Sequence, residues 1–276
     1  MSQMTVRTGI GARRWLCRKR RVPESYLKLR VFMFPPAGGD IAIYHRWEEY
    51  LPAEAEVCLV CLPGRGGRMN EPLIDDCNLM AAKIVDNISE YFDLPYVFFG
   101  HSMGALLAYK SAALAEDRGL RLPERLFLSS LKSPKHMNES GGLLDEEPLY
   151  LMDDETLKRR LLQIGGIPGV ILENENIFDY LLPTFRGDLK LCETYSHTDT
   201  ARLPIPFDVF GGNSDQIASK ADLEGWRECT DKEVTITVFP GGHFYFNSSV
   251  NLFLFNLSKR LNDVLNTISA KEELLR

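Results

Sequence analysis

The sequence predicts an α/β fold in which helices cover both faces of a mostly parallel central sheet. Short apolar runs recur along the chain, and helix-like segments separate them. Strands of a parallel sheet are buried on both faces, so they read as continuous apolar runs. With 276 residues, of which 45% are apolar, the chain is long enough to bury one large core.

Six apolar runs and four helix-like segments define the expected elements. The expected strands are 29–34, 56–62, 96–100, 125–130, 205–212 and 234–242. The expected helices are 41–51, 76–92, 103–117 and 248–268, where apolar residues recur at helical spacing. The last helix has an apolar stripe that indicates core packing, made of Phe253, Leu254, Leu257, Leu261 and Leu265.

One region interrupts this alternation. From about 134 to 200 there is no strand-like run, and the residues read as two or three helices around a joint that contains Gly and Pro. Helices inserted between two strands indicate a lid over one edge of the sheet, where loops carry function. The chain therefore divides into a basic lead-in at 1–27, a main domain at 28–265 that includes the lid, and a C-terminal tail at 266–276.

The first 25 residues are strongly basic, with seven basic residues against one acidic residue. Since the whole chain has a net charge of -6, the remainder carries -12, which is the wrong sign for general nucleic-acid binding. No run approaches the roughly 18 apolar residues of a membrane helix. We expect no nucleic-acid or membrane partner. A solvated segment anchored by Trp15 and Leu16 is favoured over an organelle transit peptide.

The six cysteines are scattered, and without a secretion signal they indicate reduced thiols in a cytoplasmic protein. Cys58 and Cys61 form a C-x-x-C motif inside the apolar run "EVCLVCLPG", which favours a buried strand over a redox or metal site. No pattern indicates a metal. The glycine-rich "CLPGRGGRMNEP" lacks the features of a nucleotide-binding loop, so we expect no nucleotide cofactor.

The stretch "VFFGHSMGALLAY" carries the strongest catalytic signal. Ser102 lies in G-x-S-x-G between an expected strand and an expected helix, which is the setting of a nucleophile elbow. A serine in a strained backbone at a sharp turn needs neighbours without side chains, here Gly100 and Gly104. An inert serine in a glycine-rich turn could share the pentapeptide. The strand before it and the helix after it favour a nucleophile.

A serine nucleophile needs a base, and His243 is the best candidate. Among the five histidines, only His243 follows an expected strand at its carboxyl end, beside two glycines. Ligands of parallel sheets bind at that edge. The other histidines lie in helix-like, elbow or lid segments: His45, His101, His136 and His197.

Asp215 is the best candidate for the acid that orients the base. It follows a strand through "GGNS", so its carboxylate can reach across the strand ends, whereas Asp208 lies inside the strand run. Asp199 and Asp222 remain alternatives. The resulting chain order of serine, aspartate and histidine is the order of the α/β-hydrolase fold.

The reaction also needs an oxyanion hole made of two backbone N–H groups. Met103, directly after the nucleophile, supplies the first. The loop "FPPAGG" supplies the second, and Ala37 is the expected donor because Pro35 and Pro36 have no N–H.

Taken together, these motifs resemble the type II, or external, thioesterases of polyketide and nonribosomal peptide synthesis. The resemblance covers residues from about 15 to 260. It is carried in order by "FMFPPAGG", "CLPGRGGRMNEP", "GHSMGALLAY", "LLQIGGIPGVILEN", "LLPTFRGDLKLCETY", "VFGGNSDQ" and "FPGGHFY". One departure is Pro36, where many relatives carry a histidine; it leaves the Ala37 N–H intact but puts in doubt any side-chain role there.

The resemblance implies an α/β-hydrolase fold with a helical lid. It also implies Ser102 as nucleophile, Asp215 as acid, His243 as base, and Met103 and Ala37 as oxyanion donors. The implied activity is hydrolysis of acyl-thioesters on the phosphopantetheine arm of acyl or peptidyl carrier proteins, by a monomer. No cofactor is implied, because phosphopantetheine belongs to the substrate.

Two other functions remain open on the residues alone. The first is a carboxylester hydrolase or acyltransferase of the same fold, and the second is a non-catalytic module that binds carrier proteins. Carrier proteins are generally acidic, as is the main body of this chain, so docking needs a local basic patch. The N-terminal arm or Arg65 and Arg68 are hypotheses for this patch.

Overall fold

The computed structural model describes residues 14–137, 143–144, 147–165, 174–198 and 202–274. Within them, one sheet has the strand order β1-β3-β2-β4-β5-β6-β7. β1 pairs antiparallel with β3, and all other neighbouring strands are parallel. The predicted mostly parallel sheet is therefore confirmed. The strands are β1 (Leu16–Lys19), β2 (Leu29–Phe34), β3 (Ala55–Val60), β4 (Tyr96–His101), β5 (Arg125–Ser129), β6 (Phe207–Gly212) and β7 (Val234–Phe239).

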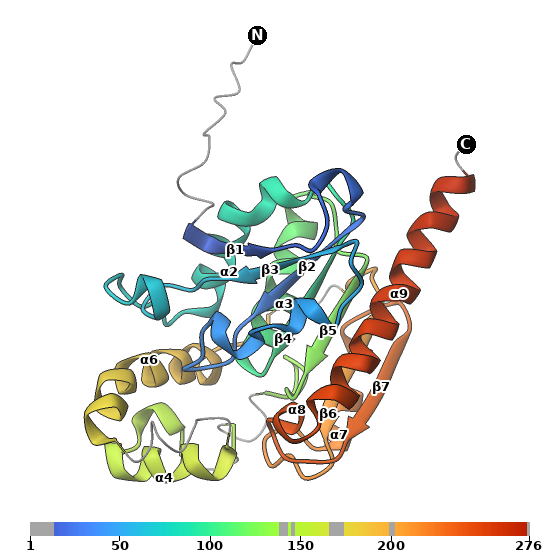
Figure 1. Ribbon diagram of the computed structural model, residues 1–276. Helices are drawn as coiled ribbons and strands as arrows, with labels where there is room; N and C mark the ends of the chain where they lie inside the picture. The colour runs from blue at the N-terminus through green and yellow to red at the C-terminus, as the bar shows by residue number, and fades with distance from the viewer. Residues whose placement is uncertain (1–13, 138–142, 145–146, 166–173, 199–201, 275–276) are drawn as a thin grey trace.

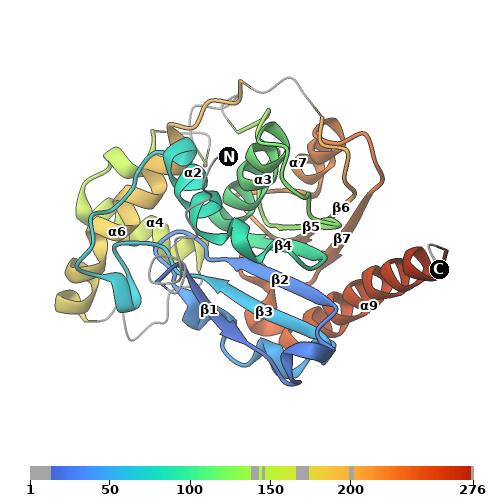
Figure 2. The ribbon, with the colours of Figure 1, turned by 90° about the horizontal axis from the view of Figure 1, so that it is seen from above.

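Helices cover both faces of the sheet, as Figures 1 and 2 show. The helices α2 (Cys77–Ile88), α3 (Met103–Asp117) and α7 (Lys220–Glu224) lie on one face, and α9 (Val250–Leu274) lies on the other. The short α8 (Tyr245–Ser248) precedes α9. The 3-10 helices are η1 (Glu24–Tyr26), η2 (Ile41–Tyr44), η3 (Trp47–Glu49), η4 (Gly66–Arg68), η5 (Ser89–Tyr91), η6 (Leu149–Leu151) and η7 (Gly225–Glu228).

The core consists of two apolar layers, one on each face of the sheet. In β4, Phe98 belongs to the layer of α2 and α3, whereas Val97 and Phe99 belong to the layer of α9. Successive side chains of a strand point to opposite faces, which explains this alternation. The predicted apolar stripe of α9 lies in the second layer, so its interpretation as core packing is confirmed.

Three expected helices differ in their bounds. Residues 41–51 do not form one helix, because the left-handed backbone of Arg46, at φ 63°, separates η2 from η3. The helix expected at 76–92 ends at Ile88 and is followed by η5. The closing helix runs to Leu274 and still buries Ile268, so residues 266–274 continue that helix and do not form a separate tail.

The basic lead-in contributes an edge strand that has no apolar run to predict it. β1 is only four residues long. Trp15 and Leu16 are buried, as expected for its anchor. Arg18 of β1 pairs with the buried Glu56 of β3 at 2.9 Å. Short, charged strands are typical of sheet edges, and they lack the apolar run that reveals a central strand.

The expected lid lies between β5 and β6. Its described part contains η6, α4 (Asp154–Ile164) and α6 (Glu175–Glu193), and no strand. Both α-helices begin at a side-chain cap, Asp153 for α4 and Asn174 for α6. The predicted joint at 166–173 lies outside the described residues. No helix in the described parts of the chain has the length and apolar character needed to cross a membrane.

Candidate active site

Ser102 occupies a strained turn between β4 and α3. Its backbone has φ 55° and ψ -122°, a region that residues with side chains rarely adopt. A Cβ on Gly100 would lie 2.0 Å from the Gly104 carbonyl oxygen. A Cβ on Gly104 would lie 2.1 Å from the Phe34 carbonyl oxygen. The backbone thus has the geometry of a nucleophile elbow, and both glycines are required for steric reasons.

His243 and Asp215 form a buried pair beside the elbow. The His243 Nδ1 lies 3.0 Å from Asp215 Oδ2 and 3.1 Å from Oδ1. Asp215 Oδ1 also accepts the Ile217 N–H at 2.9 Å. Burial raises the pKa of Asp215, but these hydrogen bonds and the charge of His243 outweigh burial and lower it below the ordinary value of 3.8. An ionised Asp215 holds the proton on Nδ1, so Nε2 is the basic nitrogen.

Ser130 supports this pair and was missed in the sequence. It directly follows β5, has a positive φ of 51°, and is fully buried. Its hydroxyl donates to the His243 carbonyl oxygen at 3.1 Å. The same hydroxyl also helps to lower the pKa of the Asp215 carboxyl. The one available signal was its place directly after a strand, in "LFLSS".

His101, which we did not expect to be the base, has other partners in the structure. It is fully buried, and its Nδ1 lies 2.9 Å from Ser129 Oγ, which in turn lies 2.8 Å from Tyr245 Oη. Burial, and then the charge of His243, lower the pKa of His101 well below its ordinary value. A neutral ring whose centroid lies 5.0 Å from that of His243 adds no positive charge beside His243.

The two expected oxyanion donors lie on adjoining elements. Met103 is the first residue of α3, where backbone N–H groups have no partner within the helix. Ala37 lies in a turn closed by a 3.0 Å hydrogen bond from the Gly39 N–H to the Pro36 carbonyl oxygen. Gly104 brings α3 against this loop. The side chain of Pro36, which stands where many relatives carry a histidine, has no polar group.

The other acid candidates lie elsewhere. Asp208 is buried within β6 and pairs with Arg125 at 2.7 Å. Asp222 forms a capping box with Ser219 at the start of α7. Asp199 lies outside the described residues. Among the described candidates, Asp215 alone is hydrogen-bonded to His243.

Comparison with known proteins decides the family. The family model described as "Thioesterase domain" matches residues 29–261, which is most of the chain. The chain belongs to the thioesterase family. The predicted enzyme class, a thioester hydrolase, is therefore confirmed.

Two curated relatives are similar to this thioesterase along most of the chain. Gramicidin S biosynthesis protein GrsT of Aneurinibacillus migulanus is 30% identical over 242 residues, which cover 88% of this chain and 92% of GrsT. Thioesterase PikA5 of Streptomyces venezuelae is 28% identical, over 90% of this chain and 85% of PikA5.

Solved structures agree with this assignment. The RedJ thioesterase from the prodiginine pathway of Streptomyces coelicolor superimposes with a TM-score of 0.79 at 32% identity, over 85% of this chain and 91% of RedJ. The type II thioesterase BorB of the borrelidin cluster has a TM-score of 0.76 at 26% identity, over 92% of this chain and 98% of BorB. The predicted α/β-hydrolase fold and the resemblance to type II thioesterases are confirmed.

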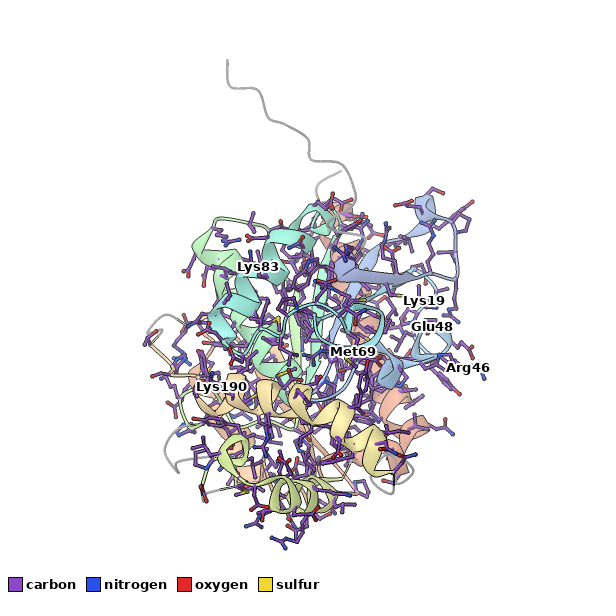
Figure 3. All side chains as sticks on the ribbon, turned by 90° about the vertical axis from the view of Figure 1, so that its left-hand side faces the viewer. Lys19, Arg46, Glu48, Met69, Lys83 and Lys190 are labelled. Atoms are coloured by element: carbon purple, nitrogen blue, oxygen red, sulfur yellow. The ribbon has the colours of Figure 1, made fainter. Side chains whose placement is uncertain are left out.

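A cavity of about 480 Å³ adjoins the loop that contains Ala37. Its walls include Ala37, Met69, Phe185 of the lid, and Phe244, which directly follows His243. Figure 3 shows Met69 between α6, which carries Lys190, and the η2–η3 segment around Arg46. A larger hollow of about 700 Å³ is lined by Arg125 and other residues at the amino ends of the strands, so it lies away from the elbow.

The hypothesis of a docking patch at Arg65 and Arg68 is wrong. Arg65 is only 4% exposed and pairs with Asp188 of the lid. Arg68 pairs with Glu71 at 2.6 Å, and its guanidinium lies 4.1 Å from the ring centroid of Trp15. Both guanidinium groups are already engaged within the molecule. Of the N-terminal arm, residues 1–13 lie outside the described residues.

Proposed function

We propose that this thioesterase releases acyl groups from the phosphopantetheine thiol of carrier proteins, in polyketide or nonribosomal peptide synthesis, through an acyl-Ser102 intermediate. The observation that carries the proposal is the strained Ser102 elbow beside the buried His243–Asp215 pair. The names of the relatives, which include gramicidin S and prodiginine biosynthesis, support the pathway class.

In the first half of the reaction, the His243 Nε2 takes the proton of the Ser102 hydroxyl as its oxygen attacks the thioester carbonyl. The tetrahedral oxyanion accepts hydrogen bonds from the Met103 and Ala37 N–H groups. The C–S bond then breaks, and the carrier thiolate takes the proton from His243. Asp215 stabilises the imidazolium during this step, since its lowered pKa keeps it ionised.

In the second half, His243 takes a proton from water, and the hydroxide oxygen attacks the acyl-Ser102 ester. The C–O bond to Ser102 breaks, the serine oxygen receives the proton from His243, and the free acid leaves. The cavity beside Ala37 and Phe185 is the site proposed for the pantetheine arm or the acyl chain. Phosphopantetheine arrives with the substrate, so the chain itself needs no cofactor.

Hydrolysis of acyl groups loaded on carrier proteins tests the proposal. We expect turnover of thioesters and much slower turnover of matched oxygen esters, and a loss of at least about a thousandfold in Ser102→Ala. A strong preference for oxygen esters would indicate a carboxylester hydrolase. Unchanged turnover in Ser102→Ala, or carrier binding without turnover, would refute the serine mechanism.

A further inference from the structure

One buried carboxylate ties the lid to the loop of the proposed oxyanion hole. Asp188 lies on the lid helix α6 and is fully buried. Its Oδ2 accepts a hydrogen bond from the Gly38 N–H at 2.7 Å. Gly38 directly follows Ala37, the proposed oxyanion donor. A side chain of the lid therefore fixes the peptide group next to the catalytic amide.

The hydrogen bond to Asp188 matters because it fixes the type of the turn that contains Ala37. The Gly39 N–H donates to the Pro36 carbonyl oxygen, and Gly38 has a φ of +68°, which are the features of a type II turn. Type I and type II turns differ in the orientation of their central peptide, whose N–H here belongs to Gly38. An acceptor for that N–H therefore selects one turn type and fixes ψ of Ala37. A Cβ on Gly38 would lie 1.8 Å from the Phe185 ring, so the lid also packs directly against the turn.

Arg65 neutralises the negative charge of the Asp188 carboxylate. A lone negative charge beside a developing oxyanion would oppose the reaction. The Arg65 Nη2 donates to Asp188 Oδ1 at 2.8 Å and its Nη1 donates to Oδ2 at 2.5 Å, a bidentate pair that neutralises the charge. The same Nη1 lies 3.4 Å from the Gly39 carbonyl oxygen. Arg65 thus contacts both the lid carboxylate and the turn.

We propose that Asp188 is a positioning residue for the oxyanion hole, and that Arg65 neutralises and orients it. The hydrogen bond to the Gly38 N–H holds the turn so that the Ala37 N–H stays aimed at the substrate oxygen. The oxyanion hole is then complete only while α6 is docked. This inference rests on the proposed function, because the oxyanion hole belongs to it.

Two variants separate positioning from folding. Arg65→Met combined with Asp188→Leu replaces the buried ion pair by apolar side chains, a change that buried pairs generally tolerate, but it removes the acceptor for the Gly38 N–H. Asp188→Asn keeps an oxygen acceptor and leaves Arg65 buried without its charge partner. Thr184→Val is the matched control. It removes another hydrogen bond between α6 and a loop, from Thr184 Oγ1 to the Gly64 carbonyl oxygen at 3.0 Å.

The readouts are melting temperature, kcat and KM on an acyl-pantetheine thioester, and the affinity for a trifluoromethyl ketone that forms a tetrahedral adduct with Ser102. We expect the double variant to keep its melting temperature and KM but to lose about 100-fold in kcat and in ketone affinity. Asp188→Asn should melt lower yet stay within about tenfold of the wild-type kcat. Thr184→Val should stay within about twofold in kcat.

A purely structural role predicts that stability and kcat fall together. The inference is overturned if the double variant folds and keeps kcat and ketone affinity within about threefold of wild type, or if Asp188→Asn is the slower of the two. If the double variant does not fold, the ketone affinities of Asp188→Asn and Asp188→Ala are compared instead. Asp188→Ala lacks the acceptor and should bind the ketone more weakly than Asp188→Asn, and equal affinities would overturn the inference. If the wild type hydrolyses no thioester, the proposed function fails, and ketone affinity alone still tests the positioning role.

Discussion

Gly104→Ala is expected to slow the enzyme by moving one proposed oxyanion donor away from the other. The new Cβ would lie 2.1 Å from the Phe34 carbonyl oxygen, whereas Cβ contacts under 3.0 Å essentially never occur. The start of α3 must therefore move by about 0.9 Å relative to the end of β2, which carries the Met103 N–H away from the Ala37 loop. Since a misplacement of about 1 Å costs about 100-fold, we expect kcat to fall by about that factor.

Steady-state kinetics on an acyl-pantetheine thioester measures this effect, with circular dichroism to show that the variant is folded. KM should change little, because the lost hydrogen bond forms mainly in the transition state. Gly67→Ala is the matched control, since its Cβ would meet no atom within 4 Å and its φ is not positive. A folded Gly104→Ala enzyme with kcat within about threefold of wild type would refute the steric reasoning.

Three further substitutions test the site. Ser130→Ala should lower kcat roughly tenfold by removing a hydrogen bond that holds His243, and an unchanged kcat would contradict this role. Because folding lowers the pKa of Asp215, the ionised carboxylate should stabilise the fold fully above its ordinary pKa of 3.8 and lose this effect as the pH falls further. The difference in unfolding free energy between wild type and Asp215→Asn should therefore shrink only below that pH. A difference that stays constant with pH would contradict this stabilising role of Asp215. Phe185→Ala should widen the cavity and raise kcat/KM for bulky acyl groups relative to acetyl, and an unchanged ratio would show that Phe185 does not line the acyl site.

The fold and the proposed triad could be predicted because their signals are local. Central strands such as β4 are buried on both faces, so each is a short apolar run. The carboxyl ends of parallel strands meet at one edge, so the residues that follow β4, β6 and β7 converge there. Gly100 and Gly104 reveal the strained turn, because any side chain at either position would collide with backbone.

The features that were missed depend on contacts between distant parts of the chain. Arg65 and Asp188 are 123 residues apart, and each alone reads as an exposed charge. For this reason the sequence suggests a docking patch at Arg65, where the structure has a buried ion pair. The edge strand β1 is too short and too basic to show an apolar pattern. Residues 41–51 read as one helix because apolar spacing does not reveal the left-handed Arg46.

The most direct test of the mechanism is a rapid-quench reaction with an acyl carrier protein, followed by mass spectrometry of the peptide that contains Ser102. With an acyl group whose Ser102 ester hydrolyses more slowly than it forms, a burst of free carrier thiol equal to the enzyme concentration is expected, with the acyl group attached to Ser102 during the burst and no burst in Ser102→Ala. Release of thiol at the wild-type rate without an acyl group on Ser102 would contradict the account.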